Sequence, residues 1–93
     1  MNQRMLDQIL PTLDPKLSEE EEAAIRELAT TMGEYEFFIT GHDFTGQIFH
    51  LTFSDGTRQL TWALMEIVEH VEALRKGTPF PWEEELKRQG IHG

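Results

Sequence analysis

The apolar residues of this chain change their spacing in the middle of the sequence. Over residues 34–53 they alternate with polar residues, and over residues 61–76 they recur about every 3.6 residues. Alternation is typical of a strand with one buried face, whereas the longer period is that of an amphipathic helix. The two patterns together predict an α+β fold in which a β-hairpin packs against a long helix.

The predicted hairpin consists of two alternating segments and a turn. The first strand covers residues 34–40, the turn covers 41–46, and the second strand covers 47–53. The side chains expected on the apolar face are Tyr35, Phe37, Ile39, Phe49, Leu51 and Phe53. A hairpin with such a face must be covered by another element.

The segment after the hairpin allows two interpretations. Asp55-Gly56 supplies the backbone conformation of a tight turn. Residues 57–60 then form a third short strand, with Thr61 as the helix N-cap and Leu60 packed on Met65; alternatively, Thr57 is itself the N-cap. We favour the third strand, because a two-stranded hairpin is only marginally stable alone.

The long helix is expected to end near Lys76, with Gly77 as its stop. Its apolar stripe is predicted to cover the hairpin and contains Leu60, Ala63, Leu64, Ile67, Val71 and Leu74. Beyond Gly77, prolines followed by an apolar pair one turn apart predict a tail over 78–93 with a short helix.

Two helices are predicted before the hairpin. Residues 1–17 contain a short amphipathic helix and a proline-containing linker. The second helix is expected over residues 19–32, with Ser18 and Glu21 forming a capping box and Gly33 as the stop. The expected order over a single domain, 1–93, is therefore helix, helix, hairpin with a third strand, long helix and short C-terminal helix.

Composition excludes several functional classes. The formal charge of −9, from 17 acidic and 8 basic side chains, disfavours direct binding to nucleic acid, because neutralising phosphates needs clustered Lys and Arg. The chain has no cysteine, so we expect neither a disulfide framework nor a thiolate metal site. No apolar run is long enough to span a membrane and no signal peptide is recognisable, so we expect a cytoplasmic protein.

Histidines and carboxylates provide an enzymatic alternative. His42 and Asp43 fall in the predicted hairpin turn, and with His50 they could act as a general base or as metal ligands. However, no motif marks a nucleophile, and turn chemistry explains the His-Asp pair more simply.

A second cluster of this kind lies on the long helix. Spacings of three and four residues place Glu66, Glu69 and His70 on neighbouring ridges of the helix, an arrangement that can bind a metal. The Glu-x-x-His pattern of helical metal sites is missing, so we interpret His70 as a boundary residue and predict no cofactor.

The favoured function is interaction with another protein. On a helical wheel, Trp62 and Met65 lie opposite the apolar stripe and beside acidic residues, which resembles an exposed contact patch. The predicted partner-binding residues are Trp62, Met65, Glu66, Glu69, Glu72, Phe80 and Trp82. Three occupants of this patch remain open: the chain's own tail through Phe80 and Trp82, a second copy, or a foreign protein.

The leading hypothesis is therefore a small acidic, non-enzymatic interaction or regulatory module, such as an adaptor or inhibitor that docks on a basic protein. Imitation of nucleic acid by its carboxylates is a variant of this hypothesis. We also expect a homodimer, because a chain this short gains core by self-association and an uncovered sheet edge invites pairing. The alternative is a metal-dependent or general-base enzyme that uses the histidines and carboxylates described above.

Overall fold

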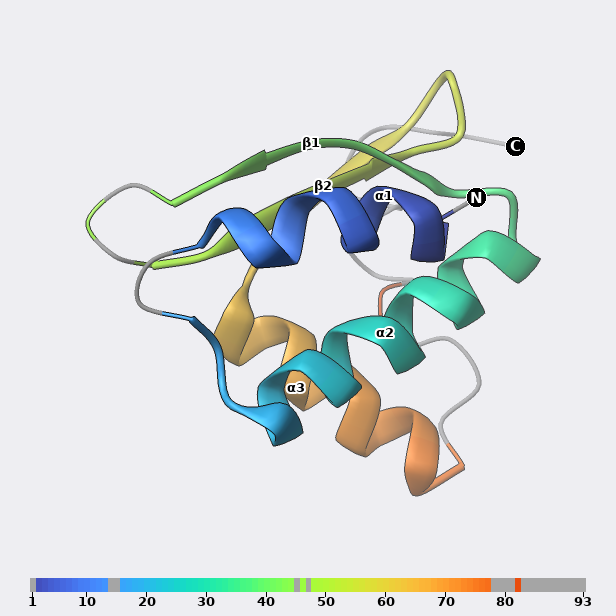
Figure 1. Ribbon diagram of the computed structural model, residues 1–93. Coiled ribbons are helices and arrows are strands. Elements are labelled where there is room, and N and C mark those ends of the chain that lie inside the picture. The colour runs from blue at the N-terminus through green and yellow to red at the C-terminus, as the bar shows by residue number, and fades with distance from the viewer. Residues whose placement is uncertain (1, 14–15, 45, 47, 78–81, 83–93) are drawn as a thin grey trace.

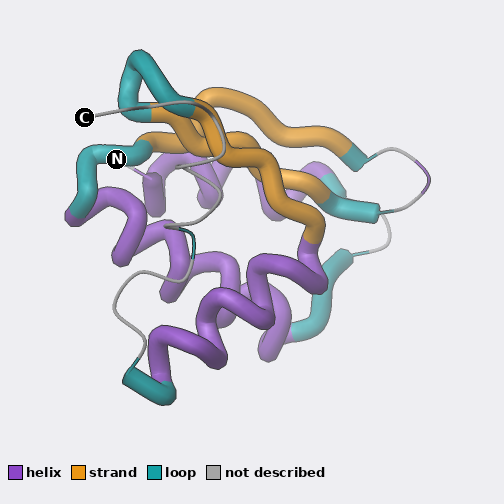
Figure 2. Tube along the Cα trace, turned by 180° about the vertical axis from the view of Figure 1, so that it is seen from behind, coloured by secondary structure: helices purple, strands orange, loops and turns teal. Residues whose placement is uncertain are grey.

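The computed structural model describes residues 2–13, 16–44, 46, 48–77 and 82. Its elements are α1 (Asn2–Ile9), the 3-10 turn η1 (Leu10–Thr12), α2 (Glu19–Glu34), β1 (Phe38–Asp43), β2 (His50–Ser54), β3 (Gln59–Ala63) and α3 (Leu64–Arg75). In this part of the chain the strands form an antiparallel sheet in the order β1-β2-β3, and the helices lie on one side of it (Figures 1 and 2). This arrangement confirms the predicted α+β fold.

The core lies between the sheet and the helices. From the sheet and the segments leading into it come Phe37, Ile39, Phe49, Leu51, Phe53, Leu60 and Trp62. From the helices come Leu6, Ile9, Ile25, Leu28, Ala29, Met32, Ile67 and Val71. Burial of these apolar surfaces is the main force that holds the layers together. No helix among the described residues combines the length and apolar character needed to cross a membrane.

The start of α2 is as predicted, but its end differs. Glu21 N donates to Ser18 Oγ and Ser18 N donates to Glu21 Oε1, which completes the capping box. The predicted stop at Gly33 is wrong, because the helix continues to Glu34. The left-handed residue that ends it is Glu36, with φ of 64°. Phe37 N bonds Met32 O and Glu36 N bonds Gly33 O, the pattern of a Schellman motif.

β1 lies later in the chain than predicted. It covers Phe38–Asp43 rather than 34–40, so Gly41, His42 and Asp43 belong to the strand and not to the turn. Tyr35, expected on the apolar face, caps α2 and is 45% exposed. The pairing register shifts between Ile39 and Gly41, as at a β-bulge. This bulge lets the strand continue to pair with β2 as far as His50.

The third strand exists, but it is longer than expected and the helix starts later. β3 pairs with β2 through Ala63, and Ala63 is the N-cap of α3. Thr61, predicted to be the cap, lies in β3 instead. Its Oγ1 is 2.9 Å from Oγ1 of Thr52 on the neighbouring strand. Leu60 is a strand residue and not part of a helical stripe. The end of α3 is as predicted, with Lys76 as C-cap and Gly77 at a φ of 95°. The predicted tail helix lies outside the described residues.

The buried Asn2 side chain joins α1 to the outer edge of β1. Asn2 Nδ2 donates to Ala29 O at 2.9 Å and to Phe37 O at 3.1 Å, and Asn2 Oδ1 accepts from Ile39 N at 2.9 Å. The amide therefore bonds to one end of the β1 edge as a neighbouring strand would. Asn2 is only 5% exposed, so these bonds are shielded from water.

We expect Asn2→Ala to lower the free energy of unfolding by roughly 2 to 4 kcal/mol, because it leaves buried backbone groups without partners. Asn2→Asp should cost a similar amount, since a carboxylate cannot donate to either carbonyl. Urea denaturation measures both changes, with the exposed Arg4→Ala on the same helix as the control. Equal free energies of unfolding for Asn2→Ala and Arg4→Ala would contradict the proposal that the Asn2 side chain stabilises the fold by bonding to the β1 edge.

The turn between β2 and β3 is held by Asp55. Its Oδ1 accepts from the backbone N–H groups of Thr57 and Arg58, and its Oδ2 accepts from Arg58 Nε and Nη2. These hydrogen bonds lower the pKa of Asp55 from 3.8 to about 2, and those from the backbone N–H groups of Arg58 and Thr57 contribute most. The ionised carboxylate is therefore part of the folded turn.

Because the pKa of Asp55 is lower in the folded state, its carboxylate stabilises the fold fully at pH values above the unfolded-state pKa. This stabilisation is lost as the pH falls through the folded-state pKa. We expect the stability difference between wild type and Asp55→Asn, on the order of 2 kcal/mol at neutral pH, to shrink as pH drops from about 4 to about 2. Urea unfolding of both proteins at a series of pH values measures this change. A difference that stays constant over that range would exclude the carboxylate as its cause.

Candidate functional site

The largest apolar hollow among those described here lies where three separate segments meet. These segments are the approach to α2, the β1–β2 connection and the start of α3, all at one end of the molecule (Figures 1 and 2). The hollow measures about 590 Å³ and is lined by Lys16, Leu17, Glu21, Phe44, Ile48, Phe49, Ala63, Leu64, Met65 and Glu66. We call it the Met65 groove.

Two apolar side chains of the Met65 groove are largely exposed. Met65 is 75% exposed and Ile48 is 53% exposed, while Leu17, Phe44 and Leu64 are partly buried and pack on the core beneath. Large apolar side chains gathered in a hollow are typical of a binding surface, because leaving them in water costs free energy.

Capping residues place carboxylates at the rim of this groove. Glu21 is the third residue of α2 and Glu66 is the third residue of α3, and each accepts a hydrogen bond from the backbone N–H of its helix's N-cap. Each of these bonds uses Oε1, and a carboxylate has further acceptor positions. The rim therefore carries two carboxylates and the ammonium group of Lys16, a net negative charge, above an apolar floor.

The structure separates the two residues that were predicted to form the contact patch. Met65 lies on the first turn of α3 and is exposed as expected. The prediction that Trp62 is exposed is wrong, because Trp62 belongs to β3 and is completely buried. The helical wheel failed because it extended the helix two residues into the strand, where side chains alternate between faces.

The Trp82 side chain of the tail packs against Trp62. The ring centroids of the two tryptophans lie 5.8 Å apart, and Trp82 is 1% exposed. The His70 ring lies 4.2 Å from the Trp62 ring. The alternative in which the tail covers Trp62 is thus confirmed for Trp82, while Phe80 lies outside the described residues. The buried Trp62 and Trp82 side chains offer no docking surface.

The acidic residues of the predicted patch are distributed unevenly. Glu66 lines the Met65 groove, and Glu72 lines a neighbouring hollow between α2 and α3. Glu69 is exposed but lines neither hollow.

The residues of the alternative catalytic set are only partly brought together. Asp43 pairs with His50 across the strands, while His42 pairs with Leu51 and therefore points to the other side of the sheet. His50 Nδ1 lies 3.1 Å from Ile48 O and must donate there, because a carbonyl only accepts. None of the hollows described here is lined by a histidine.

The predicted metal cluster is not assembled. Glu66 caps α3, and His70 stacks on Trp62. Across the described part of the chain, no group of three or more His, Asp and Glu side chains is close enough to hold a metal ion. Within the described residues, Glu66, Glu69 and His70 therefore do not form such a group.

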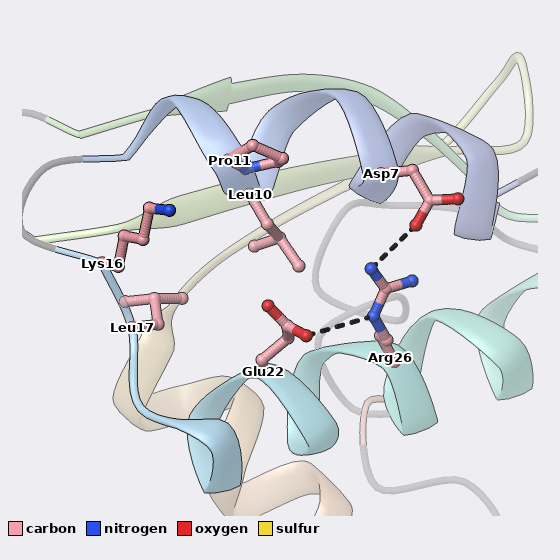
Figure 3. Close-up of a pocket in the computed structure, with 7 residues that line it drawn as sticks. All are labelled: Asp7, Leu10, Pro11, Lys16, Leu17, Glu22 and Arg26. Atoms are coloured by element: carbon pink, nitrogen blue, oxygen red, sulfur yellow. Dashed lines mark hydrogen bonds and ion pairs between the residues drawn. The ribbon is translucent and has the colours of Figure 1, made fainter.

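A smaller hollow of about 230 Å³ between α1 and α2 contains Arg26 (Figure 3). Its guanidinium contacts Asp7 Oδ1 at 2.8 Å, Gln3 Oε1 at 2.9 Å and Glu22 Oε2 at 3.7 Å. These contacts engage all three guanidinium nitrogens. Arg26 thus ties the two helices together and is not arranged to receive an external anion.

Sequence reasoning missed Leu17, Phe44 and Ile48 as members of the groove. A usable signal existed for Leu17, which precedes the N-cap Ser18, where an apolar residue usually packs on the fourth helical residue. That residue is Glu22, so Leu17 has no apolar staple partner within its own helix. Ile48 also stood on the less apolar side of the predicted strand. No local sequence pattern, however, could predict that these residues lie beside Met65 in the folded protein.

Because Trp62 is in the core and Met65 is on the surface, substituting Trp62 should lower the free energy of unfolding much more than substituting Met65. We expect Trp62→Ala to cost about 3 to 5 kcal/mol of unfolding free energy and Met65→Ala to change it by less than about 0.5 kcal/mol. Urea denaturation monitored by far-UV circular dichroism compares the two variants. Similar losses for both would mean that Met65 is part of the packed core.

Comparison with known proteins gave no match to a family model, to a curated protein or to a solved structure. What the chain binds must therefore be inferred from the shape, exposure and charge of its own surfaces.

Proposed function

We propose that this protein is a small acidic interaction module that binds a basic segment of a partner protein in the Met65 groove. The observation that carries the proposal is the exposure of Met65 and Ile48 over an apolar hollow with carboxylates at its rim. Met adapts its shape to different apolar surfaces, so it suits a contact residue.

The charge of the protein supports a basic partner. The formal net charge is −9, and the first turn of α2, which borders the groove, consists of Glu19, Glu20, Glu21 and Glu22. Such a field speeds encounter with cationic surfaces and disfavours acidic ones. Apolar anchors flanked by Lys or Arg are therefore the complementary chemistry. By occupying a basic surface of its partner, the module would act as an adaptor or an inhibitor.

The expected homodimer is a separate matter from the groove. β1 and β3 are the edges of the sheet, through which two copies of the chain could pair. A dimer formed in that way is compatible with the proposed function when the Met65 groove stays accessible in it.

A display library of random peptides provides a probe for this proposal. We expect the enriched peptides to carry bulky apolar residues next to Lys or Arg, and to bind Met65→Lys at least about tenfold more weakly than wild type. Met5→Lys on α1 is the matched control, because it makes the same chemical change at a surface residue outside the groove, and it should bind like wild type.

Two results would contradict the proposal. One is enrichment of peptides that bind wild type and Met65→Lys equally. The other is a dimer in sedimentation equilibrium that Met65→Lys dissociates, because the groove would then belong to a second copy of the chain.

A further inference from the structure

A second hollow extends the Met65 groove along α3. It measures about 420 Å³ and is lined by Glu20, Glu21, Ala23, Ala24, Val68, Val71, Glu72 and Arg75. Glu21 lines both hollows, so they adjoin at the start of α2. Together they follow α3 from its first residue to its last, a length of about 18 Å for 12 residues. We call the two hollows together the extended groove.

The floor of the extended groove has helical spacing. Leu64, Val68 and Val71 are separated by four and three residues, so they lie along one side of α3. On the α2 side the lining residues Ala23 and Ala24 have small side chains, which allows another backbone to approach closely. An apolar surface of this shape fits a row of side chains repeated every three or four residues.

The helical walls of the extended groove offer few backbone groups for pairing with an extended peptide. Beyond their first turns, the backbone amides and carbonyls of α2 and α3 are engaged in the hydrogen bonds of the helices themselves. Leu64 N, at the start of α3, bonds Phe49 O at 2.9 Å. An occupant that lies along these two helices must therefore satisfy its own backbone groups, as a helix does and a strand does not.

Acidic residues also line the extended part. Glu20 and Glu72 lie on opposite walls, and the Arg75 guanidinium is already held by Glu27 at 3.0 Å and 3.2 Å. The negative rim of the Met65 groove thus continues along α3. Cationic side chains on both flanks of an occupant would meet carboxylates.

We propose that the occupant of the extended groove is a basic amphipathic helix of about three turns, with apolar anchors at positions i, i+4 and i+7 and Lys or Arg on its flanks. This inference rests on the proposed function, because it specifies the partner segment that the same site receives.

Three synthetic peptides with blocked ends test the inference. The first, of about 14 residues, places Leu at i, i+4 and i+7 among Lys, Arg and Ala. The second has the same composition in scrambled order, and the third carries a proline in the middle, which breaks a helix. We expect the first peptide to bind at least about tenfold more tightly than the others in fluorescence anisotropy titrations. Circular dichroism should show that this peptide becomes helical in the complex.

Charge reversal tests the acidic flank. We expect Glu72→Lys to weaken binding of the helical peptide by roughly threefold to tenfold, an effect that decreases as salt is raised. Glu34→Lys is the matched control, because Glu34 is an exposed residue of α2 outside the extended groove. Both residues are exposed, so thermal unfolding of the two variants should remain close to wild type.

The outcomes separate this inference from the proposed function. If all three peptides bind equally and Met65→Lys weakens them all, the groove binds basic protein segments but the helical occupant is wrong. If none binds, the helical occupant is also wrong, and the peptide selection against Met65→Lys then decides the proposed function independently. Equal binding of the helical peptide to wild type and Glu72→Lys would overturn the acidic flank.

Discussion

The passage from β3 into α3 without an intervening loop is the constraint on which the rest of the structure depends. β3 stays in register with β2 through Ala63, and α3 begins at the next residue. A strand alternates its side chains between two faces, and a helix rotates them by about 100° per residue. At this junction Trp62 is directed into the core, whereas Met65 emerges at the surface. The core and the candidate binding surface are thus set by the same few residues.

The aromatic cluster around Trp62 shows why this junction is stable. Phe53 contacts Trp62 from the neighbouring strand, His70 contacts it from α3, and Trp82 contacts it from the tail. Trp62 and Ile67 flank the first turn of α3 in the positions of a hydrophobic staple, and both are buried. Burial of both residues holds the start of α3 against the core, where α3 runs beside α2.

The position of α3 beside α2 creates the surface that we propose as functional. Glu21 and Glu66 each cap their own helix and also stand at the rim of the Met65 groove. These carboxylates have a local reason to be there, since acidic residues stabilise the first turn of a helix. Their second effect is to give an apolar groove a negative border, which is what makes a basic helical partner complementary. At the edge of the sheet opposite β3, Asn2 occupies part of the β1 edge and so limits pairing there.

Features that depend on neighbours in the sequence could be predicted from the sequence alone. The α+β class, the Ser18 and Glu21 capping box, the inward set of β2 and the end of α3 just before Gly77 each follow from local spacing or local hydrogen bonding. Tertiary structure decided the rest. Pairing with β2 overrode the expected cap at Thr61, and packing of distant segments buried Trp62 and brought Leu17 and Ile48 beside Met65. The physical reason is that strand register and side-chain burial depend on partners far away in the chain, which no local pattern contains.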